Sequence, residues 1–260
     1  MDSLPLTAFL LESINFWGGL GILTSQVARE TFTGKIYWKL VVEQIYQVGY
    51  RSTPLILITS GSIGMVMALQ FGLGLEKFGG KLYVPKLVAA TILREIGPMF
   101  TSLMFAARIG AGMASEIGSM TVTQQIDAIR ALGTSPIQKI VIPRVIACLI
   151  ALPALVAFAN IIGNAGSLIV GATELKLDPN FYYLKIMSTA SLEDYLSGFV
   201  KTFFFSLFIS LSSCYFGLNV KNGAKEVGIA TTKAVVVSSI MILVGDFFLS
   251  KLIWMITKWV

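Results

Sequence analysis

The sequence predicts an all-α polytopic membrane protein, and its composition, charge distribution and apolar segments each support this fold class. Of its 260 residues, 55% are hydrophobic and only 13% are charged, about half of the roughly 25% typical of soluble domains. Such a chain could not cover its own surface in water. The net charge of +6 comes from basic residues spread between apolar segments, so it indicates membrane loops and not a nucleic-acid partner.

Several kinds of chemistry are missing from the sequence. The chain has no histidine, which excludes histidine metal sites and catalytic pairs of serine or cysteine with histidine. No phosphate-binding loop of the form G-x-x-x-x-G-K-[ST] occurs. Cys148 and Cys214 lie in apolar runs, where we expect buried thiols and no disulfide. We therefore expect no catalytic residues, no metal, no cofactor and no cleavable signal peptide.

Residues 1–52 are expected to lie at the membrane interface. Apolar residues recur at helical spacing over Leu4–Ala28, but Glu12 and a glycine pair interrupt them, which favours an interfacial helix over a spanning one. A second amphipathic piece follows at Tyr37–Tyr50. The alternative is a first spanning helix at Phe9–Val27, a segment only marginally long enough to cross.

Residues 54–256 are expected to form a single bundle of five spans, within one domain of residues 1–260. Glycines in the first span would permit either close backbone approach or a local break. Small residues in the third span would let a neighbouring helix approach closely. A longer polar connection, Thr173–Lys201, separates the third span from the fourth. The predicted spans are Pro54–Leu75, Leu87–Ala107, Val145–Ala172, Thr202–Leu218 and Ala234–Trp254.

The second predicted span carries two adjacent charges, Arg94 and Glu95. Glu95 lies roughly 14 Å along the helix from Lys86, near the middle of the bilayer. Adjacent helical residues do not face one another, so each charge needs its own partner or a hydrated cavity, and Asp246 is a candidate partner for Arg94. Pro98 removes the backbone hydrogen bond to residue 94 and can kink the helix. The charges predict either the wall of a substrate pathway or a structural ion pair, unless the span is shifted toward the interface.

A short polar helix is predicted over Val122–Leu132, after small residues that repeat at four-residue spacing in 106–114. Thr121 and Gln124 have the spacing of a capping box, and Gly133 indicates a stop. The helix is too short to span, so it either offers an apolar ridge to another protein or packs on its own bundle. The ridge consists of Val122, Ile126, Ile129 and Leu132.

The distribution of basic residues predicts the orientation in the membrane. With five spans, the basic segments 1–51, 108–144 and 219–233 fall on the same side, which the positive-inside rule makes cytoplasmic. The acidic-leaning connection 173–201 and the C-terminus then lie outside. Three lysines in 77–86 are an exception to this rule.

Three functional hypotheses fit these features. The chain could be the membrane subunit of a transporter driven by a separate ATPase, which would explain the polar helix as a docking element. It could be an ion-coupled carrier that uses Arg94, Glu95 and Asp246 as a relay, although the internal repeat common in that class is not evident. It could also be a structural anchor, which would leave Arg94 and Glu95 unexplained.

Short motifs occur in a fixed order from about Val48 onward. They are LREIGP at Leu93–Pro98, SEIGSM at Ser115–Met120, QIDAIRALGTSP at Gln125–Pro136, IPR at Ile142–Arg144 and GIATTKAVVVSS at Gly228–Ser239, followed by Asp246. Their identity and order resemble the MlaE-type permease family.

The resemblance implies an inner-membrane permease subunit of an ABC transporter that moves phospholipid between the inner and outer membranes. In that family two permeases pair, each with an interfacial elbow helix and five spans. An ATPase dimer docks from the cytoplasm, a hexamer of MCE-domain proteins sits on the periplasmic face, and a STAS-domain subunit can bind the ATPase.

The resemblance also implies two sets of functional residues. The first set would line a lipid cavity between the two permeases near the outer leaflet, where Arg94 could bind a phosphate. This sequence departs from the family pattern at Gly72 and Gly74, which make the first span less bulky than expected for a lipid-lined wall. The cavity set is Met67, Gln70, Leu75, Phe78, Arg94, Glu95 and Ile96, and the ATPase-coupling set is Val122, Gln125, Ile126, Asp127, Ile129, Arg130 and Leu132.

Overall fold

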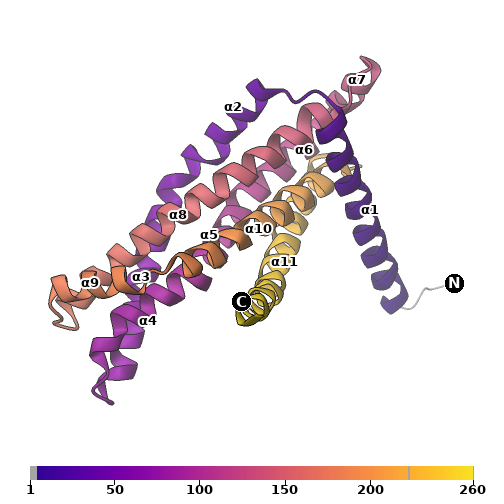
Figure 1. Cartoon of the computed structure of the whole chain (residues 1–260). Helices are drawn as coiled ribbons and strands as arrows, with labels where there is room; N and C mark the ends of the chain where they lie inside the picture. Colours follow the sequence, from indigo (N-terminus) through magenta and orange to yellow (C-terminus); the bar gives the residue numbers. More distant parts are fainter. Residues whose placement is uncertain (1–4, 222, 260) are drawn as a thin grey trace.

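The computed structural model describes residues 5–221 and 223–259, and this part of the chain is about 90% helical, without a strand (Figure 1). Five helical segments are long and apolar enough to cross a membrane, which confirms the all-α class and the five spans. The segments are Trp38–Glu76, Lys81–Val122, Ile137–Thr173, Leu192–Leu218 and Gly223–Thr257. The helices are α1 (Pro5–Thr33), α2 (Trp38–Val48), α3 (Thr53–Glu76), α4 (Val84–Thr91), α5 (Gly97–Phe105), α6 (Ala111–Val122), α7 (Gln125–Ala131), α8 (Ile142–Thr173), α9 (Pro179–Thr189), α10 (Leu192–Leu218) and α11 (Gly223–Trp259).

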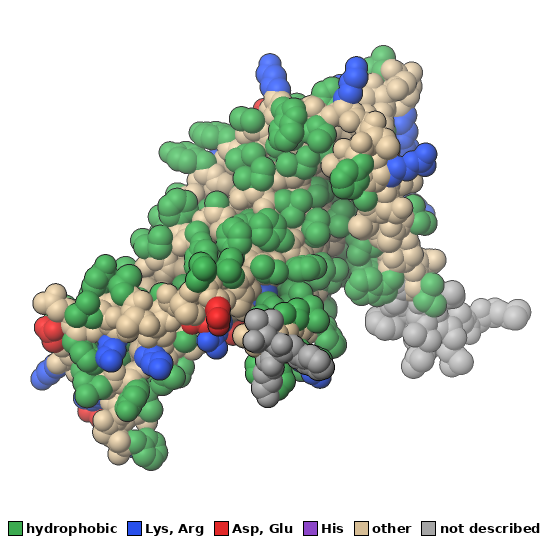
Figure 2. Space-filling model, viewed as in Figure 1, with side chains coloured by type: hydrophobic (Ala, Val, Ile, Leu, Met, Phe, Trp, Pro, Cys, Tyr) green, Lys and Arg blue, Asp and Glu red, His purple; other side chains and the backbone are tan. Residues whose placement is uncertain are grey.

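Hydrophobic side chains cover the visible flank of the bundle, and most of the visible Lys and Arg side chains lie toward its ends (Figure 2). This is the surface expected of a bundle whose flank faces lipid and whose ends face water.

Helix α1 runs along one side of the bundle and diverges from it toward its N-terminal end (Figure 1). Leu20, Leu23 and Val27 bury its inner face in a cluster with α8 and α10. Near its other end, Glu30 accepts a hydrogen bond from the Ser135 hydroxyl at 2.6 Å. The predicted start of this helix at Leu4 lies outside the described residues, and its interfacial position stays a prediction.

Helix α2 continues into α3 through a single tight turn, Tyr50–Ser52. Its Val41 and Val48 are buried, and the helix lies against α8. The amphipathic piece predicted at Tyr37–Tyr50 is therefore helical and extends the first span toward its N-terminal end.

Helix α8 lies at the centre of the bundle and packs against α3 with direct backbone contact. A Cβ added to Gly64 would overlap the carbonyl of Gly163, and one added to Gly166 would overlap the carbonyl of Gly61. Only glycine permits this separation. The prediction that small residues in the first and third spans bring helices together is confirmed.

Helices α4, α5 and α6 form one continuous segment, interrupted only by π-turns at Ile92–Ile96 and Ala106–Gly110. The second span therefore continues to Val122, and the prediction that a loop begins at Arg108 was wrong. The small residues of this region pack against α10, where Gly110 lies close to Ser213. A π-turn keeps the backbone hydrogen-bonded while it changes the direction of the following side chains.

The connection Thr173–Lys201 contains more helix than predicted. Asp178 accepts a hydrogen bond from the Phe181 amide and caps α9, and Ser191 caps α10 in the same way. Helix α10 therefore begins at Leu192, and the prediction that the fourth span begins at Thr202 was wrong by about three turns of helix.

Candidate functional site

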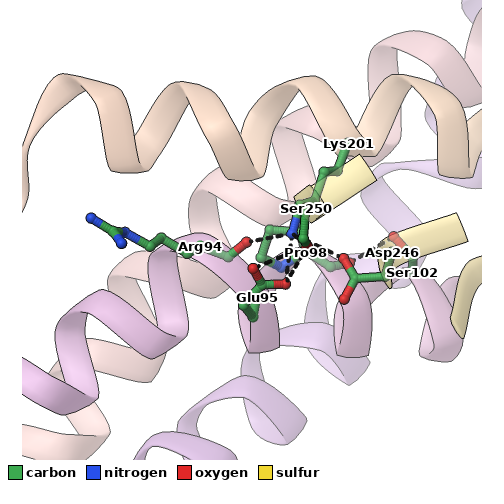
Figure 3. Close-up of polar contacts among 7 residues, drawn as sticks. All are labelled: Arg94, Glu95, Pro98, Ser102, Lys201, Asp246 and Ser250. Carbon is green, nitrogen blue, oxygen red and sulfur yellow. Dashed lines mark hydrogen bonds and ion pairs between the residues drawn. The ribbon is translucent and has the colours of Figure 1, made fainter. Parts of the chain in front are cut away.

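The charged pair of the second span lies in the first π-turn, beside α10 and α11 (Figure 3). Pro98 has no backbone N–H, so the carbonyl of Arg94 lacks its usual helical donor. The ammonium of Lys201 on α10 donates to this carbonyl at 3.1 Å. The proline thus creates an acceptor inside the span, and a buried lysine uses it.

Lys201 is fully buried and is held by groups from two other helical segments, the second span and α11. Its ammonium donates to Glu95 Oε2 at 2.6 Å and to the Ser250 hydroxyl at 2.6 Å, in addition to the Arg94 carbonyl. These contacts match its three N–H donors. Asp246 Oδ1 lies 3.1 Å from the same nitrogen as an ion pair without hydrogen-bond geometry. A buried ammonium is tolerated only when it is surrounded in this way.

Ser250 connects Glu95 with Lys201. Its hydroxyl accepts from the lysine and lies 3.1 Å from both carboxylate oxygens of Glu95, to which it can donate. Glu95, Lys201, Asp246 and Ser250 form what we call the interior charge cluster, which ties the second, fourth and fifth spans together.

Arg94 points away from the interior charge cluster (Figure 3). Its Nε and Nη2 both face Oδ1 of Asp194, in the first turn of α10. The arginine side chain is 56% exposed, whereas that of Asp194 is only 7% exposed. The positive end of the α10 dipole stabilises a carboxylate at this position. Asp194 is thus the fixed partner, and Arg94 presents charge toward the surface of the bundle.

The structure confirms that Arg94 and Glu95 each have a separate partner, but Asp246 as the partner of Arg94 was wrong. Asp194 and Lys201 were not predicted as site residues, because both lie in the stretch predicted to be a polar connection. A signal was available: Ser191-x-x-Asp194 before an apolar run has the form of a capping box. A helix that begins there places Asp194 and Lys201, seven residues apart, on the same face.

The remaining residues of the predicted cavity set lie in other surroundings. Met67 and Leu75 pack into an apolar cluster formed by α3, α4 and α8, whereas Gln70 and Phe78 are exposed. Ile96 lines a small pocket between α3, α5 and α8, about large enough for one water molecule. Within one chain, then, Arg94 contacts α10 and Glu95 contacts α10 and α11. The predicted cavity residues of α3 make their contacts elsewhere.

The predicted polar helix exists, but it begins differently. Helix α7 starts at Gln125, after a left-handed residue, Gln124, with no side-chain cap. Thr121 belongs to α6, and its hydroxyl binds the carbonyls of Ile117 and Gly217. The capping box at Thr121 was therefore wrong. A positive φ of 74° at Gly133 confirms the predicted stop.

The predicted apolar ridge divides into a buried part and an exposed part. Ile126 is buried, and Ile129 packs partly against the same cluster; Val122 packs against the start of α11. Leu132 alone of the four is largely exposed, at 80%. Much of the ridge therefore stabilises the chain's own bundle.

The polar residues of α7 are available to a partner. Gln125, Asp127 and Arg130 are all exposed. Asp127 and Arg130 form an ion pair of 3.2 Å on the surface. With Leu132 they make up what we call the α7 surface.

Comparison with known proteins gives a consistent result over most of the chain. The family described as permease MlaE matches residues 41–252. A probable ABC transporter permease protein of Rickettsia typhi is 38% identical over 219 residues, which cover 84% of this chain and 85% of the relative. A probable ABC transporter permease protein of Synechocystis is 35% identical over 89% of this chain and 88% of its own length. The intermembrane phospholipid transport system permease protein MlaE of Haemophilus influenzae is 31% identical over 84% of both chains.

Proposed function

The chain belongs to the MlaE permease family, and we propose that it moves phospholipid between the inner and outer membranes as the permease of an ABC transporter. Its relatives are permease subunits, and its five apolar helical segments make it a multi-pass protein of the inner membrane. Family membership favours an ATP-driven transporter over the ion-coupled carrier considered from the sequence.

The observation that carries the proposal is the partly exposed charge pair in the second span. Arg94 and Glu95 expose 56% and 42% of their side chains, although they belong to a segment able to cross the membrane. Charges in such a place are expensive unless they serve a substrate pathway or a protein contact. A guanidinium there can bind a phosphate through paired hydrogen bonds.

The lipid cavity is proposed to form between two copies of the chain. In that arrangement Arg94 and Glu95 receive the headgroup, and apolar residues of α3 and its surroundings, including Met67, Leu75 and Phe78, contact the acyl chains. Gln70 and Ile96 complete the proposed lining. The exposed apolar surface of α3 and α11 offers area for both the second copy and lipid.

The α7 surface is proposed as the docking site for a cytoplasmic ATPase dimer. Gln125, Asp127, Arg130 and Leu132 are exposed there, so they are the side chains a partner could reach. Val122, Ile126 and Ile129 would support the helix from beneath. The N-terminus is then cytoplasmic and the C-terminus periplasmic, with a hexamer of MCE-domain proteins on the periplasmic face and a STAS-domain subunit as a further partner of the ATPase.

Transport on this proposal comes from a difference in lipid affinity between two states. ATP-driven closure of the ATPases moves α7, and α6 transmits the motion because α6 continues directly into the π-turns and α5. The free energy available for lipid release equals the difference in affinity between the open and collapsed cavity.

The test is purification from native membranes, followed by mass spectrometry of the bound proteins and lipids. Leu132→Asp is expected to lose the ATPase and retain the fold, whereas Glu95→Ala is expected to retain the ATPase and alter the bound lipid. Leu184→Asp on α9 is the matched control, because Leu184 is also exposed, at 64%, but lies far from α7 in the chain. A wild-type protein that purifies alone and without lipid would refute the proposal.

A further inference from the structure

The charges around the candidate site do not balance. Arg94 and Lys201 supply two positive charges, whereas Glu95, Asp194 and Asp246 supply three negative ones when ionised. The set therefore has a net charge of −1. The exposed neighbours Glu193 and Lys251 carry opposite charges and leave this sum unchanged.

The positive charges of the set are already satisfied. Lys201 is enclosed by two carboxylates and is fully buried, so a ligand cannot reach it. Arg94 can be reached, but it is paired with Asp194. An anionic group that approaches Arg94 therefore also approaches the carboxylate of Asp194.

Asp194 is held in place by the start of its helix. Its backbone amide donates to the Ser191 hydroxyl at 3.1 Å, and its side chain is almost completely buried. It cannot withdraw from an arriving anion as a flexible surface side chain could. The side chain of Glu95 is 42% exposed, although its carboxylate oxygens contact Lys201 and Ser250.

We propose that this site takes a phospholipid whose headgroup carries both a phosphate and an ammonium in preference to an anionic phospholipid, and that Asp194 sets this preference. The inference rests on the proposed function. The phosphate binds Arg94, and the ammonium is attracted by the net negative charge of the set. The phosphate of either headgroup meets the carboxylate of Asp194, but only the ammonium offsets this repulsion. An anionic headgroup has no positive group to do so, which is how a site rejects a competing ligand.

The experiment measures lipid selection in a defined membrane. The full chain, in complex with its ATPase, is reconstituted in vesicles of equal parts phosphatidylethanolamine and phosphatidylglycerol, repurified and analysed by lipid mass spectrometry. We expect phosphatidylethanolamine to be enriched about threefold in the wild type, the size expected of a partly exposed charge contact. Asp194→Asn should abolish the enrichment, and Asp194→Glu should restore it.

Glu193→Gln is the matched control, because it removes an exposed negative charge from the adjacent position and should leave the selection unchanged. If Asp194→Asn does not fold, Glu95→Gln decides, since it also removes one negative charge from the set and should also abolish the enrichment. Bound lipid in the same proportion as the vesicle overturns the preference and leaves the proposed function standing. Absence of bound lipid in the wild type overturns the proposed function itself.

Discussion

The interior charge cluster and the α7 surface are built from the same kinds of residue but differ in their exposure to water. In the cluster, Lys201 is fully buried and contacts two carboxylates. On α7, Arg130 and Asp127 are each about two-thirds exposed. Removing one partner of a buried pair costs about 3–5 kcal/mol, whereas an exposed pair contributes about 1 kcal/mol or less.

This difference assigns different roles to the two regions. The cluster holds three spans in one arrangement, and its charges must remain paired in every state in which it stays buried. The α7 residues have little influence on the fold, so they are free to serve a partner. Arg94 lies between these extremes, because it is half exposed while its partner Asp194 is buried.

The largest expected effect comes from Lys201→Met, which leaves Glu95 and Asp246 without their cation. We expect a loss of about 3–5 kcal/mol in the free energy of unfolding, measured by thermal or denaturant unfolding in detergent. Adding Glu95→Gln and Asp246→Asn to the same protein should recover most of the loss. If Lys201→Met alone is as stable as the wild type, the buried charge pairs do not contribute more to stability than the exposed pair on α7.

The second-largest effect is expected in the apolar ridge of α7, where a buried and an exposed residue should differ in their contribution to stability. Ile126→Ala should lower the free energy of unfolding by about 2–3 kcal/mol, toward the low end for buried aliphatic residues. Leu132→Ala should leave it unchanged, because Leu132 is 80% exposed. Equal losses in the two variants would contradict the division of the ridge into a supporting part and an exposed part.

Arg94→Gln tests the intermediate case. The change leaves the buried Asp194 carboxylate without its cation, at a cost of about 1–3 kcal/mol. Asp194→Asn combined with Arg94→Gln should be more stable than Arg94→Gln alone. A stability for Arg94→Gln equal to that of the wild type would show that Asp194 is compensated by its helix terminus and not by the arginine.

The smallest expected effect is that of Asp127→Asn or Arg130→Gln. Because this pair is exposed, each change should alter the free energy of unfolding by less than about 0.5 kcal/mol. On the proposed function, each should nevertheless weaken ATPase binding, measured as the ATPase recovered per permease. A large loss of stability would show that Asp127 and Arg130 support the fold, as the charges of the interior charge cluster do.

The sequence was sufficient for the features that depend on composition and local pattern. Five apolar stretches separated by polar segments predicted five spans, because the length of an apolar helix must match the bilayer. The glycines of α3 and α8 predicted close packing, and Gly133 predicted the end of α7. The adjacent charges Arg94 and Glu95 predicted two separate partners, because neighbouring residues on a helix point in different directions.

Only the tertiary structure decided which groups those partners are. Lys201 lies 106 positions from Glu95 in the chain, and Asp246 is farther still; no local pattern determines which charges meet across packed helices. The structure likewise separated Ile126 from Leu132, which have the same hydrophobic character in the sequence. Local sequence determined where helices form and which residues share a face, whereas burial and charge pairing depend on how the helices pack against one another.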